Sequence, residues 1–207
     1  ALKNVAHTYR TQAACREERA DGHFSVGPIN LTLKAGELEY IVGGNGSGKS
    51  TLAKLITGLY VPASGSIRLD SQPIVDTNRS WYRQHFSAVF SDFYLFERLV
   101  SAEALTLDSQ AQTYLKKLQL EDKVSVQSGQ LSTTALSQGQ RKRLSLLTAY
   151  LEDWPIYLFD EWAADQDTVF REIYYTQLLA ELKARGKTIL VISHDDHNIH
   201  VADRIIN

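Results

Sequence analysis

The feature that most constrains this chain is one glycine-rich stretch, Gly43-Gly44-Asn45-Gly46-Ser47-Gly48-Lys49-Ser50, which is followed by Thr51. It fits the pattern G-x-x-x-x-G-K-[ST] of a phosphate-binding loop. Residues 39–42 before it are apolar and aromatic and predict a buried strand, and residues 51–57 after it predict a helix. A loop between a strand and a helix directs backbone N–H groups toward a bound anion. The sequence therefore predicts a nucleotide-binding domain of the α/β class.

Each residue type in this loop has a physical task. The four glycines let the backbone turn and approach a ligand without a β-carbon in the way. Lys49 can reach the β- and γ-phosphates, which gives it a catalytic role as well as a binding role. The Ser50 hydroxyl can ligate Mg²⁺. We therefore expect residues 43–51 to bind the phosphates of a nucleotide together with its metal ion.

Length and composition narrow the class of protein. The 207 residues suffice for one large domain, and a net charge of −2 gives no reason to expect nucleic-acid binding. The short basic run Arg141-Lys142-Arg143 is interpreted as a solvated helix face. Cys15 is the only cysteine, which excludes a disulfide framework. The chain has no methionine, so we expect it to be part of a longer protein.

Apolar patterns predict further elements on both sides of the loop. Residues 3–9 and 24–33 before it resemble antiparallel strands, and the polar residues 10–21 between them form a loop or a short helix. The elements predicted after it are a strand at 66–70, a short helix at 81–86, a strand at 86–90, a helical stretch at 95–131, a helix at 139–152, a strand at 156–159, a helix at 168–185 and a strand at 188–193. The near-continuous apolar strands are typical of a parallel sheet that is covered on both faces.

Two carboxylates follow one of these buried strands. Asp160 and Glu161 come directly after residues 156–159, and ligand sites in open α/β sheets lie at the carboxyl ends of the strands. Asp160 suits the coordination shell of Mg²⁺, and Glu161 suits a general base for the attacking water. The alternative is an acidic pair that caps a helix, but the phosphate-binding loop in the same chain favours the catalytic interpretation.

A second motif lies just before the predicted helix at 139–152. Leu136-Ser137-Gln138-Gly139-Gln140 resembles the L-S-G-G-Q signature of ATP-binding-cassette (ABC) ATPases, with Gln138 in place of the first glycine. The resemblance extends through the family's other motifs. Tyr9 falls where an aromatic stacks on adenine, with Phe24 as the weaker alternative, Asp167 falls at the D-loop aspartate and His194 at the switch histidine. Ser91 stands where the family usually has the Q-loop glutamine, which leaves the coupling of the nucleotide site to a partner in question.

Five stretches resemble a narrower group, the bacterial exporters of cyclic peptides and siderophores of the syringomycin, pyoverdine and microcin type. They are residues 27–31, 43–46, 86–93, 159–167 and 193–197, and residue 91 is serine in that group as well. The resemblance implies a P-loop NTPase fold with a RecA-like parallel core, an N-terminal antiparallel β subdomain and a helical subdomain. Its implied bounds are 1–90 and 154–207 for the core with the β subdomain and about 95–150 for the helical subdomain.

The resemblance also implies ligands, partners and a mechanism. ATP and Mg²⁺ are the expected ligands, and a second copy of the domain is the expected partner. In that homodimer, residues 137–140 of one copy cover the ATP bound to Lys49, Ser50 and Asp160 of the other. A transmembrane domain fused on the N-terminal side would place the chain at the cytoplasmic face of the bacterial inner membrane. Residues 202–207 stop inside the terminal strands that are usual in the family.

Two other functions stay open at this point. One is a soluble ABC ATPase of the repair or translation type, and such proteins usually pair two cassettes on one chain or add a coiled coil. The other is a regulatory cassette that does not hydrolyse ATP, for which Ser91 is the argument. A GTPase or a small kinase is disfavoured because neither class carries the element at residues 136–140.

Overall fold

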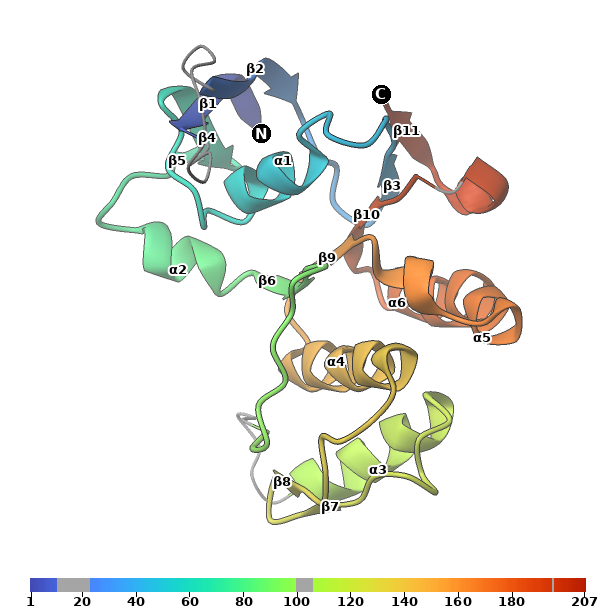
Figure 1. The fold of residues 1–207 in the computed structure, drawn as a ribbon. Helices are drawn as coiled ribbons and strands as arrows, with labels where there is room; N and C mark the ends of the chain where they lie inside the picture. Colours follow the sequence, from blue (N-terminus) through green and yellow to red (C-terminus); the bar gives the residue numbers. More distant parts are fainter. Residues whose placement is uncertain (11–22, 100–105, 195) are drawn as a thin grey trace, which may run out of the picture. The chain divides into compact units, whose positions relative to one another are not determined.

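The computed structural model describes residues 1–10, 23–99, 106–194 and 196–207, without the side chains of residues 9, 10, 23 and 196–198 (Figure 1). It forms two compact units, which we describe separately. The first unit comprises Ala1–Lys34 and Asn45–Gln84, and the second comprises Ala35–Gly44 and His85–Asn207. The predicted loop or helix at residues 10–21 lies mostly outside the described residues.

The first unit contains an antiparallel sheet with the strand order β2-β1-β4-β5. Its strands are β1 (Leu2–Arg10), β2 (His23–Leu31), β4 (Ser64–Leu69) and β5 (Gln72–Pro73). Its core contains Leu2, Val5 and Ile67, which are nearly or fully buried. Inward-facing apolar residues that alternate with exposed ones are typical of a sheet with one covered face. The expected antiparallel subdomain is therefore confirmed.

Two helices belong to the same unit, α1 (Lys49–Ile56) and α2 (Arg79–Arg83). The helix α1 buries Ala53, Leu55 and Ile56, and Tyr82 on α2 donates a hydrogen bond of 2.5 Å to the Ile56 carbonyl oxygen. This bond satisfies one of the carbonyl groups that the end of α1 leaves without a helical partner. The helix α2 begins before the predicted range of 81–86 and ends inside it at Arg83, because the chain is extended again in β6 from Phe86.

The second unit contains a five-stranded sheet with the order β11-β3-β10-β9-β6, in which every pair is parallel. Its strands are β3 (Leu38–Ile41), β6 (Phe86–Val89), β9 (Ile156–Asp160), β10 (Thr188–Ile192) and β11 (Arg204–Ile206). All residues of β3 and β10 are buried, as expected for strands that are covered on both faces. The expected parallel core is therefore confirmed.

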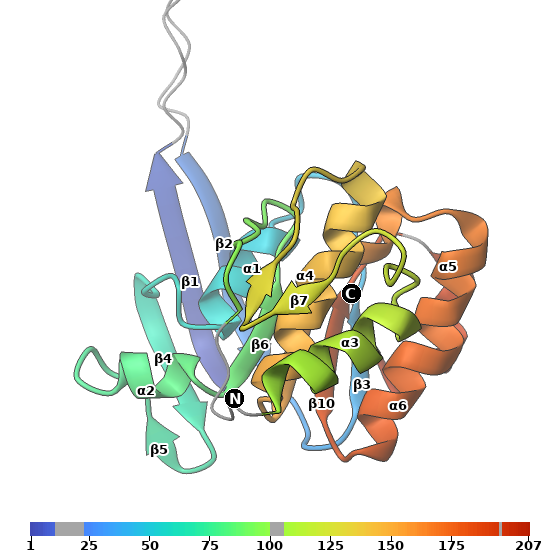
Figure 2. The same cartoon turned by 90° about the horizontal axis from the view of Figure 1, so that it is seen from below.

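Helices and a small hairpin complete the second unit. They are α3 (Leu107–Lys117), β7 (Val126–Gln127), β8 (Gln130–Leu131), α4 (Gln138–Glu152), the 3₁₀ segment η1 (Trp162–Asp165), α5 (Thr168–Ile173), the π segment η2 (Tyr174–Leu178), α6 (Leu179–Ala184) and the 3₁₀ segment η3 (Asp196–Val201). Figure 2 shows α3 beside α4, and the two helices are in contact. Among the described helices, none has the length and apolar character that a membrane span requires.

The helical pattern predicted over residues 95–131 is only partly realised. The helix α3 ends at Lys117, and Gln119 just after it has a positive φ of 56°, which breaks the helix. Residues 126–131 form the β7–β8 hairpin, where Ser128 and Gly129 turn the chain with φ values of 52° and 74°. The turn chemistry of Ser128-Gly129 therefore overrides the apolar spacing that predicted a helix.

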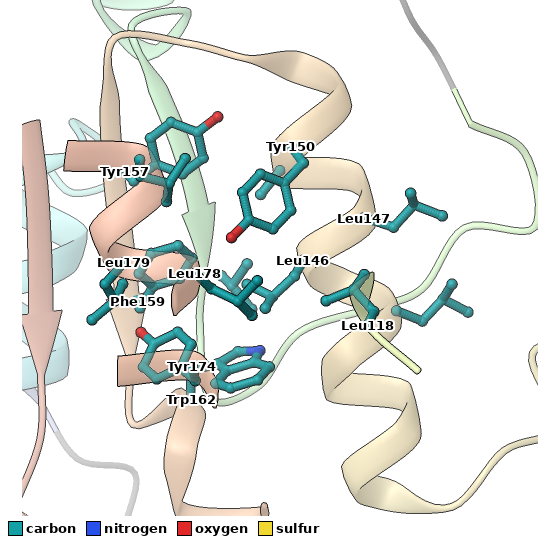
Figure 3. Packing of buried hydrophobic residues seen from close by; sticks show 14 of the residues in the cluster. Leu118, Leu146, Leu147, Tyr150, Tyr157, Phe159, Trp162, Tyr174, Leu178 and Leu179 are labelled. Carbon is teal, nitrogen blue, oxygen red and sulfur yellow. The ribbon is translucent and has the colours of Figure 1, made fainter. Parts of the chain in front are cut away.

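An aromatic cluster fixes β9 to the helices of its unit (Figure 3). Trp162 stacks on Tyr174 with 4.4 Å between ring centroids, and Phe159 meets Tyr174 edge-on at 5.8 Å. Tyr150 on α4 lies 6.3 Å from Tyr157. Truncating a fully buried aromatic to alanine destabilises a core by about 3–5 kcal/mol. The strand end that carries Asp160 and Glu161 is thus attached to a rigid core.

Candidate nucleotide site

The phosphate-binding loop has the geometry that its glycines predict. Gly48 precedes α1 with a φ of 94°, and Gly46 has a φ of 77°. A β-carbon on Gly48 would lie 2.5 Å from Val26 Cγ2 and 3.3 Å from Phe24 Cζ, so a larger residue does not fit without displacement. The loop is exposed from Gly43 to Ser47. The first turn of α1, which includes Lys49, Ser50 and Thr51, thus offers an anion-binding helix terminus.

Asp160 and Glu161 stand at the carboxyl end of β9, in the second unit. Asp160 pairs with Ile192 of β10 and is 1% exposed. Glu161 leaves the strand in the left-handed conformation, with φ 51° and ψ 34°, and its N–H donates to the Ile192 carbonyl oxygen at 2.9 Å. A left-handed conformation is uncommon for a residue with a side chain, and such residues cluster at functional sites.

The structure brings His194 to Glu161. His194 follows β10, and its Nδ1 lies 3.6 Å from Glu161 Oε1, with the two side chains 52% and 31% exposed. The parallel pairing of β9 and β10 causes this proximity, because neighbouring parallel strands end at the same edge of the sheet. A carboxylate next to an imidazole at that edge can accept, hold and pass on a proton.

Ser91 and Tyr9 are two further sequence-predicted positions outside the helix α4. Ser91 is exposed and follows β6, which is the neighbour of β9, so it lies at the same edge of the sheet as Glu161. The backbone of Tyr9 pairs with Phe24 between β1 and β2. The Tyr9 side chain lies outside the described part of the chain, so its predicted stacking on adenine stays a prediction.

The helix α4 begins at the predicted signature. Ser137 is its N-cap and forms a capping box with Gln140: Gln140 N–H donates to Ser137 Oγ at 3.4 Å, and the Gln140 side chain accepts from Ser137 N–H at 3.2 Å. Ser137 and Gln138 are exposed at this helix terminus. Gly139 packs closely on the loop that follows β9, and its carbonyl oxygen accepts a hydrogen bond from Gln166 Nε2 at 3.2 Å.

The basic run after the signature is not the solvated face that we expected. The Lys142 side chain is only 4% exposed, and its Nζ lies 2.6 Å from Asp165 Oδ2 and donates to the Glu161 carbonyl oxygen at 3.0 Å. The Lys142 ammonium lowers the pKa of the Asp165 carboxyl chiefly through the hydrogen bond that it donates to this carboxyl. Of the three basic residues 141–143, only Arg141 is exposed. Local sequence could not predict this arrangement because the partners of Lys142 lie beyond the end of β9.

Asp167 is the N-cap of α5, since its Oδ1 accepts a 2.9 Å hydrogen bond from Phe170 N–H. This bond is the main reason why the pKa of the Asp167 carboxyl is lowered. Arg143 from α4 forms an ion pair with Asp167, donates to Gln166 Oε1 at 2.9 Å and lies 3.7 Å above the Phe170 ring. The sequence motifs did not indicate these contacts of Lys142, Arg143, Asp165 and Gln166, although the unusual acidic pair in Asp165-Gln166-Asp167 was an available signal.

The donor chemistry of the predicted metal ligands fits Mg²⁺. Ser50 supplies a hydroxyl at the start of α1, and Asp160 supplies a buried carboxylate at the end of β9. The described residues contain no group of three or more metal-ligating His, Cys, Asp or Glu side chains. Mg²⁺ in nucleotide sites is typically bound by one or two protein groups together with water and phosphate oxygens, and each of these two side chains is an oxygen donor of that kind.

Known proteins are similar to this chain in sequence. The chain matches the family described as ABC transporter over residues 26–164. It is 55% identical to the ATP-binding protein SyrD of Pseudomonas syringae pv. syringae over 99% of this chain and 36% of that protein. It is 32% identical to the ATP-dependent lipid A-core flippase of Ralstonia nicotianae over 90% of this chain and 33% of that protein. The chain thus spans about a third of the length of these curated relatives.

A solved structure extends the comparison to three dimensions. The dimeric post-hydrolysis state of the ATP-binding cassette MJ0796, bound to ADP and Pi, matches with a TM-score of 0.81 at 27% identity. The match covers 99% of this chain and 92% of that one.

Proposed function

This chain belongs to the ABC transporter family, and on that premise we propose that it is the ATP-binding and ATP-hydrolysing domain of an exporter. The observation that carries the proposal is the proximity of Glu161 and His194, whose Oε1 and Nδ1 atoms lie 3.6 Å apart at the ends of neighbouring parallel strands. Glu161 directly follows Asp160, the predicted metal ligand at the end of β9, and His194 follows the neighbouring strand β10. The phosphate-binding loop supplies the matching nucleotide motif.

Each residue has a role in the proposed hydrolysis. Glu161 accepts a proton from water while the water oxygen forms a bond to the γ-phosphorus and the bond to the β–γ bridging oxygen breaks. The products are ADP and phosphate. His194 contacts the γ-phosphate and orients Glu161, and Lys49 offsets charge on the β- and γ-phosphates. Mg²⁺, assigned to Ser50 and Asp160 from their sequence motifs, would neutralise further phosphate charge.

We assign the remaining predicted positions in the same way. Tyr9 would stack on adenine, residues 43–51 would bind the phosphates, and Ser91 would take the Q-loop position. In a head-to-tail homodimer, residues 137–140 of one copy would cover the nucleotide of the other, next to the D-loop Asp167. The dimeric state of the matching cassette supports this arrangement. ATP then closes the dimer because its γ-phosphate bridges two surfaces, and hydrolysis opens it.

The proposed partner in the same polypeptide is a transmembrane domain on the N-terminal side. The support is that the chain corresponds to 36% of SyrD and 33% of the flippase. The proposed location is accordingly the cytoplasmic face of the bacterial inner membrane. The proposed cargo is a cyclic peptide or a siderophore-like compound, on the strength of the resemblance of residues 159–167 and the other motifs to exporters of that kind.

Two measurements test this function. Antibody detection of the native protein after fractionation should find a species of roughly 60 kDa, the sum of a family membrane domain and this one, that stays in the membrane pellet after a carbonate wash. A soluble species near the 23.3 kDa of this chain would contradict the fused-exporter proposal. It would favour a detachable ATPase subunit or a soluble ABC protein of the repair or translation type. Phosphate release from ATP tests hydrolysis itself, and its absence would favour a regulatory cassette.

A further inference from the structure

We propose that Lys142 is a positioning residue for ATP hydrolysis, which fixes the backbone of Glu161 and ties it to the helix α4. The inference rests on the proposed function, because it assigns Lys142 a role through the proposed general base. It adds a residue from a part of α4 that the family signature at 136–140 does not include.

The contacts of the Lys142 side chain carry the first step. Its Nζ donates to the Glu161 carbonyl oxygen at 3.0 Å and lies 2.6 Å from Asp165 Oδ2, while the side chain is 4% exposed. Removing an ammonium group from water is unfavourable unless it is both paired and hydrogen-bonded. Here the carboxylate supplies the charge and the carbonyl supplies a second acceptor. The lysine is thus held at one place on the loop that follows β9.

The main chain of Lys142 is held by the same loop. Its carbonyl oxygen accepts a 2.8 Å hydrogen bond from Trp162 Nε1, so helix and loop each donate to the other's backbone. Trp162 is 1% exposed and stacks on Tyr174, which anchors the loop side of this arrangement in the core (Figure 3). The Lys142–Trp162 clamp, as we name these two reciprocal contacts, leaves Glu161 little freedom to shift along the helix.

Glu161 needs such support because of its backbone conformation. Its φ of 51° is unfavourable for a residue with a β-carbon and persists only where the surroundings determine it. The structure holds Glu161 from both sides: Ile192 accepts from its N–H at 2.9 Å, and Lys142 donates to its carbonyl oxygen. Without Lys142, the peptide after Glu161 can rotate toward a more favourable conformation. That rotation would move the carboxylate away from the attacking water.

The position of Lys142 on α4 gives the clamp a second consequence. Ser137 is the N-cap of the same helix. In the proposed dimer it contacts the nucleotide bound to the partner, whereas Glu161 acts on the nucleotide bound to its own chain. One buried side chain therefore joins the helix that senses one nucleotide to the base that acts on the other.

The test is the substitution Lys142→Met in the full-length protein, with Lys187→Met as the matched control. Lys187 makes the same kind of contacts at the other end of α4: its Nζ lies 2.8 Å from the carbonyl oxygen of Asp153 and 2.8 Å from its Oδ1. Asp153 is left-handed like Glu161, with φ 50° and ψ 34°. Both substitutions remove a lysine that donates a hydrogen bond to the carbonyl oxygen of a left-handed residue. Only one of those residues, Glu161, is the proposed base.

We expect both variants to lose thermal stability to a similar extent. Only Lys142→Met should lower kcat, by about 10- to 100-fold, because displacing a catalytic group by about 1 Å has an effect of that size. The KM for ATP should stay within about twofold, since the phosphate-binding loop is unchanged. A kcat of Lys142→Met equal to that of Lys187→Met would overturn the inference, as would a rise in KM with an unchanged kcat.

A second variant covers the case in which Lys142→Met does not fold. Trp162→Phe keeps an aromatic ring in the cluster but removes the hydrogen bond to the Lys142 carbonyl oxygen. It should lower kcat at least about threefold at unchanged KM, and an unchanged kcat would overturn the inference. The proposed function fails separately. If the wild-type protein releases no phosphate, the ATPase assignment is wrong. If the wild type is active and the Lys142→Met variant is equally active, the ATPase assignment stands and only the positioning role of Lys142 is refuted.

Discussion

Gly139 lies directly against the backbone of Asp165: a β-carbon on Gly139 would approach the Asp165 carbonyl oxygen to 2.9 Å. The helix that begins at Ser137 and the loop that follows β9 are therefore packed too closely for any side chain at this position. This contact explains in structural terms why the second glycine of the signature is present although the first is replaced by Gln138.

The substitution Gly139→Ala should push the loop away from α4. Because the obstructing atom belongs to the backbone, relief requires movement of the chain and should lower stability by roughly 1–3 kcal/mol. Thermal unfolding and phosphate release should both decline. Arg141→Ala on the same turn is the control, since Arg141 is exposed. Equal melting temperatures and equal rates of phosphate release for the two variants would show that the close contact contributes nothing to stability or activity.

The substitution Gly48→Ala should damage the first unit in two separable ways. It adds an atom 2.5 Å from Val26 Cγ2, and it places a β-carbon on a residue with a φ of 94°. The double variant Gly48→Ala/Val26→Ala removes the collision but keeps the unfavourable φ, so it should recover only part of the lost stability. Chemical denaturation measures this. Full recovery would mean that the left-handed conformation is not required.

The charge of Asp165 should contribute to stability only above acidic pH. Lys142 holds the pKa of this carboxyl below its ordinary value of 3.8, so the folded state favours the ionised form. The contribution is fully present above that ordinary value and is lost as the pH falls through the folded-state pKa. It should not exceed about 1 kcal/mol, since the carboxylate is 41% exposed and therefore screened.

The comparison of wild type with Asp165→Asn measures this effect. The difference in the free energy of unfolding should be constant between about pH 5 and 7 and should shrink below about pH 4. Urea denaturation at a series of pH values gives it directly. A difference that grows on acidification would contradict the assigned pairing with Lys142.

Ser91 should not block hydrolysis. We expect serine to serve at this position in the exporter group that the chain resembles, so Ser91→Gln should change the rate of phosphate release by no more than a few-fold, or less than about 1 kcal/mol in the barrier. A gain of two orders of magnitude would instead favour a regulatory cassette that lacks its glutamine. Asp92→Asn next to it serves as the control for changes in that exposed loop.

Sequence alone predicted the elements that follow regular patterns. The buried strands β9 and β10 and the helix α4 lie close to their expected bounds because apolar periodicity reports burial within one element. The prediction that Lys142 is solvated was wrong because its burial depends on Asp165 and Glu161, and the periodicity of the helix carries no information on those contacts. Within the stretch at 95–131, the helix α3 was predicted, but residues 126–131 form a hairpin because Ser128-Gly129 impose a turn on residues with helical spacing. The proximity of Glu161 and His194 needed the order of the strands.

Glu161 is the proposed base of the ATPase, and the substitution Glu161→Gln removes the carboxylate that this role requires. The amide has nearly the shape of the carboxylate but cannot accept the proton, so ATP should still bind while the rate of phosphate release falls by at least about 100-fold. Size-exclusion chromatography with ATP should then show a stable dimer that the wild type forms only transiently. Normal turnover by Glu161→Gln would mean that Glu161 is not the base, because another group would have to accept the proton.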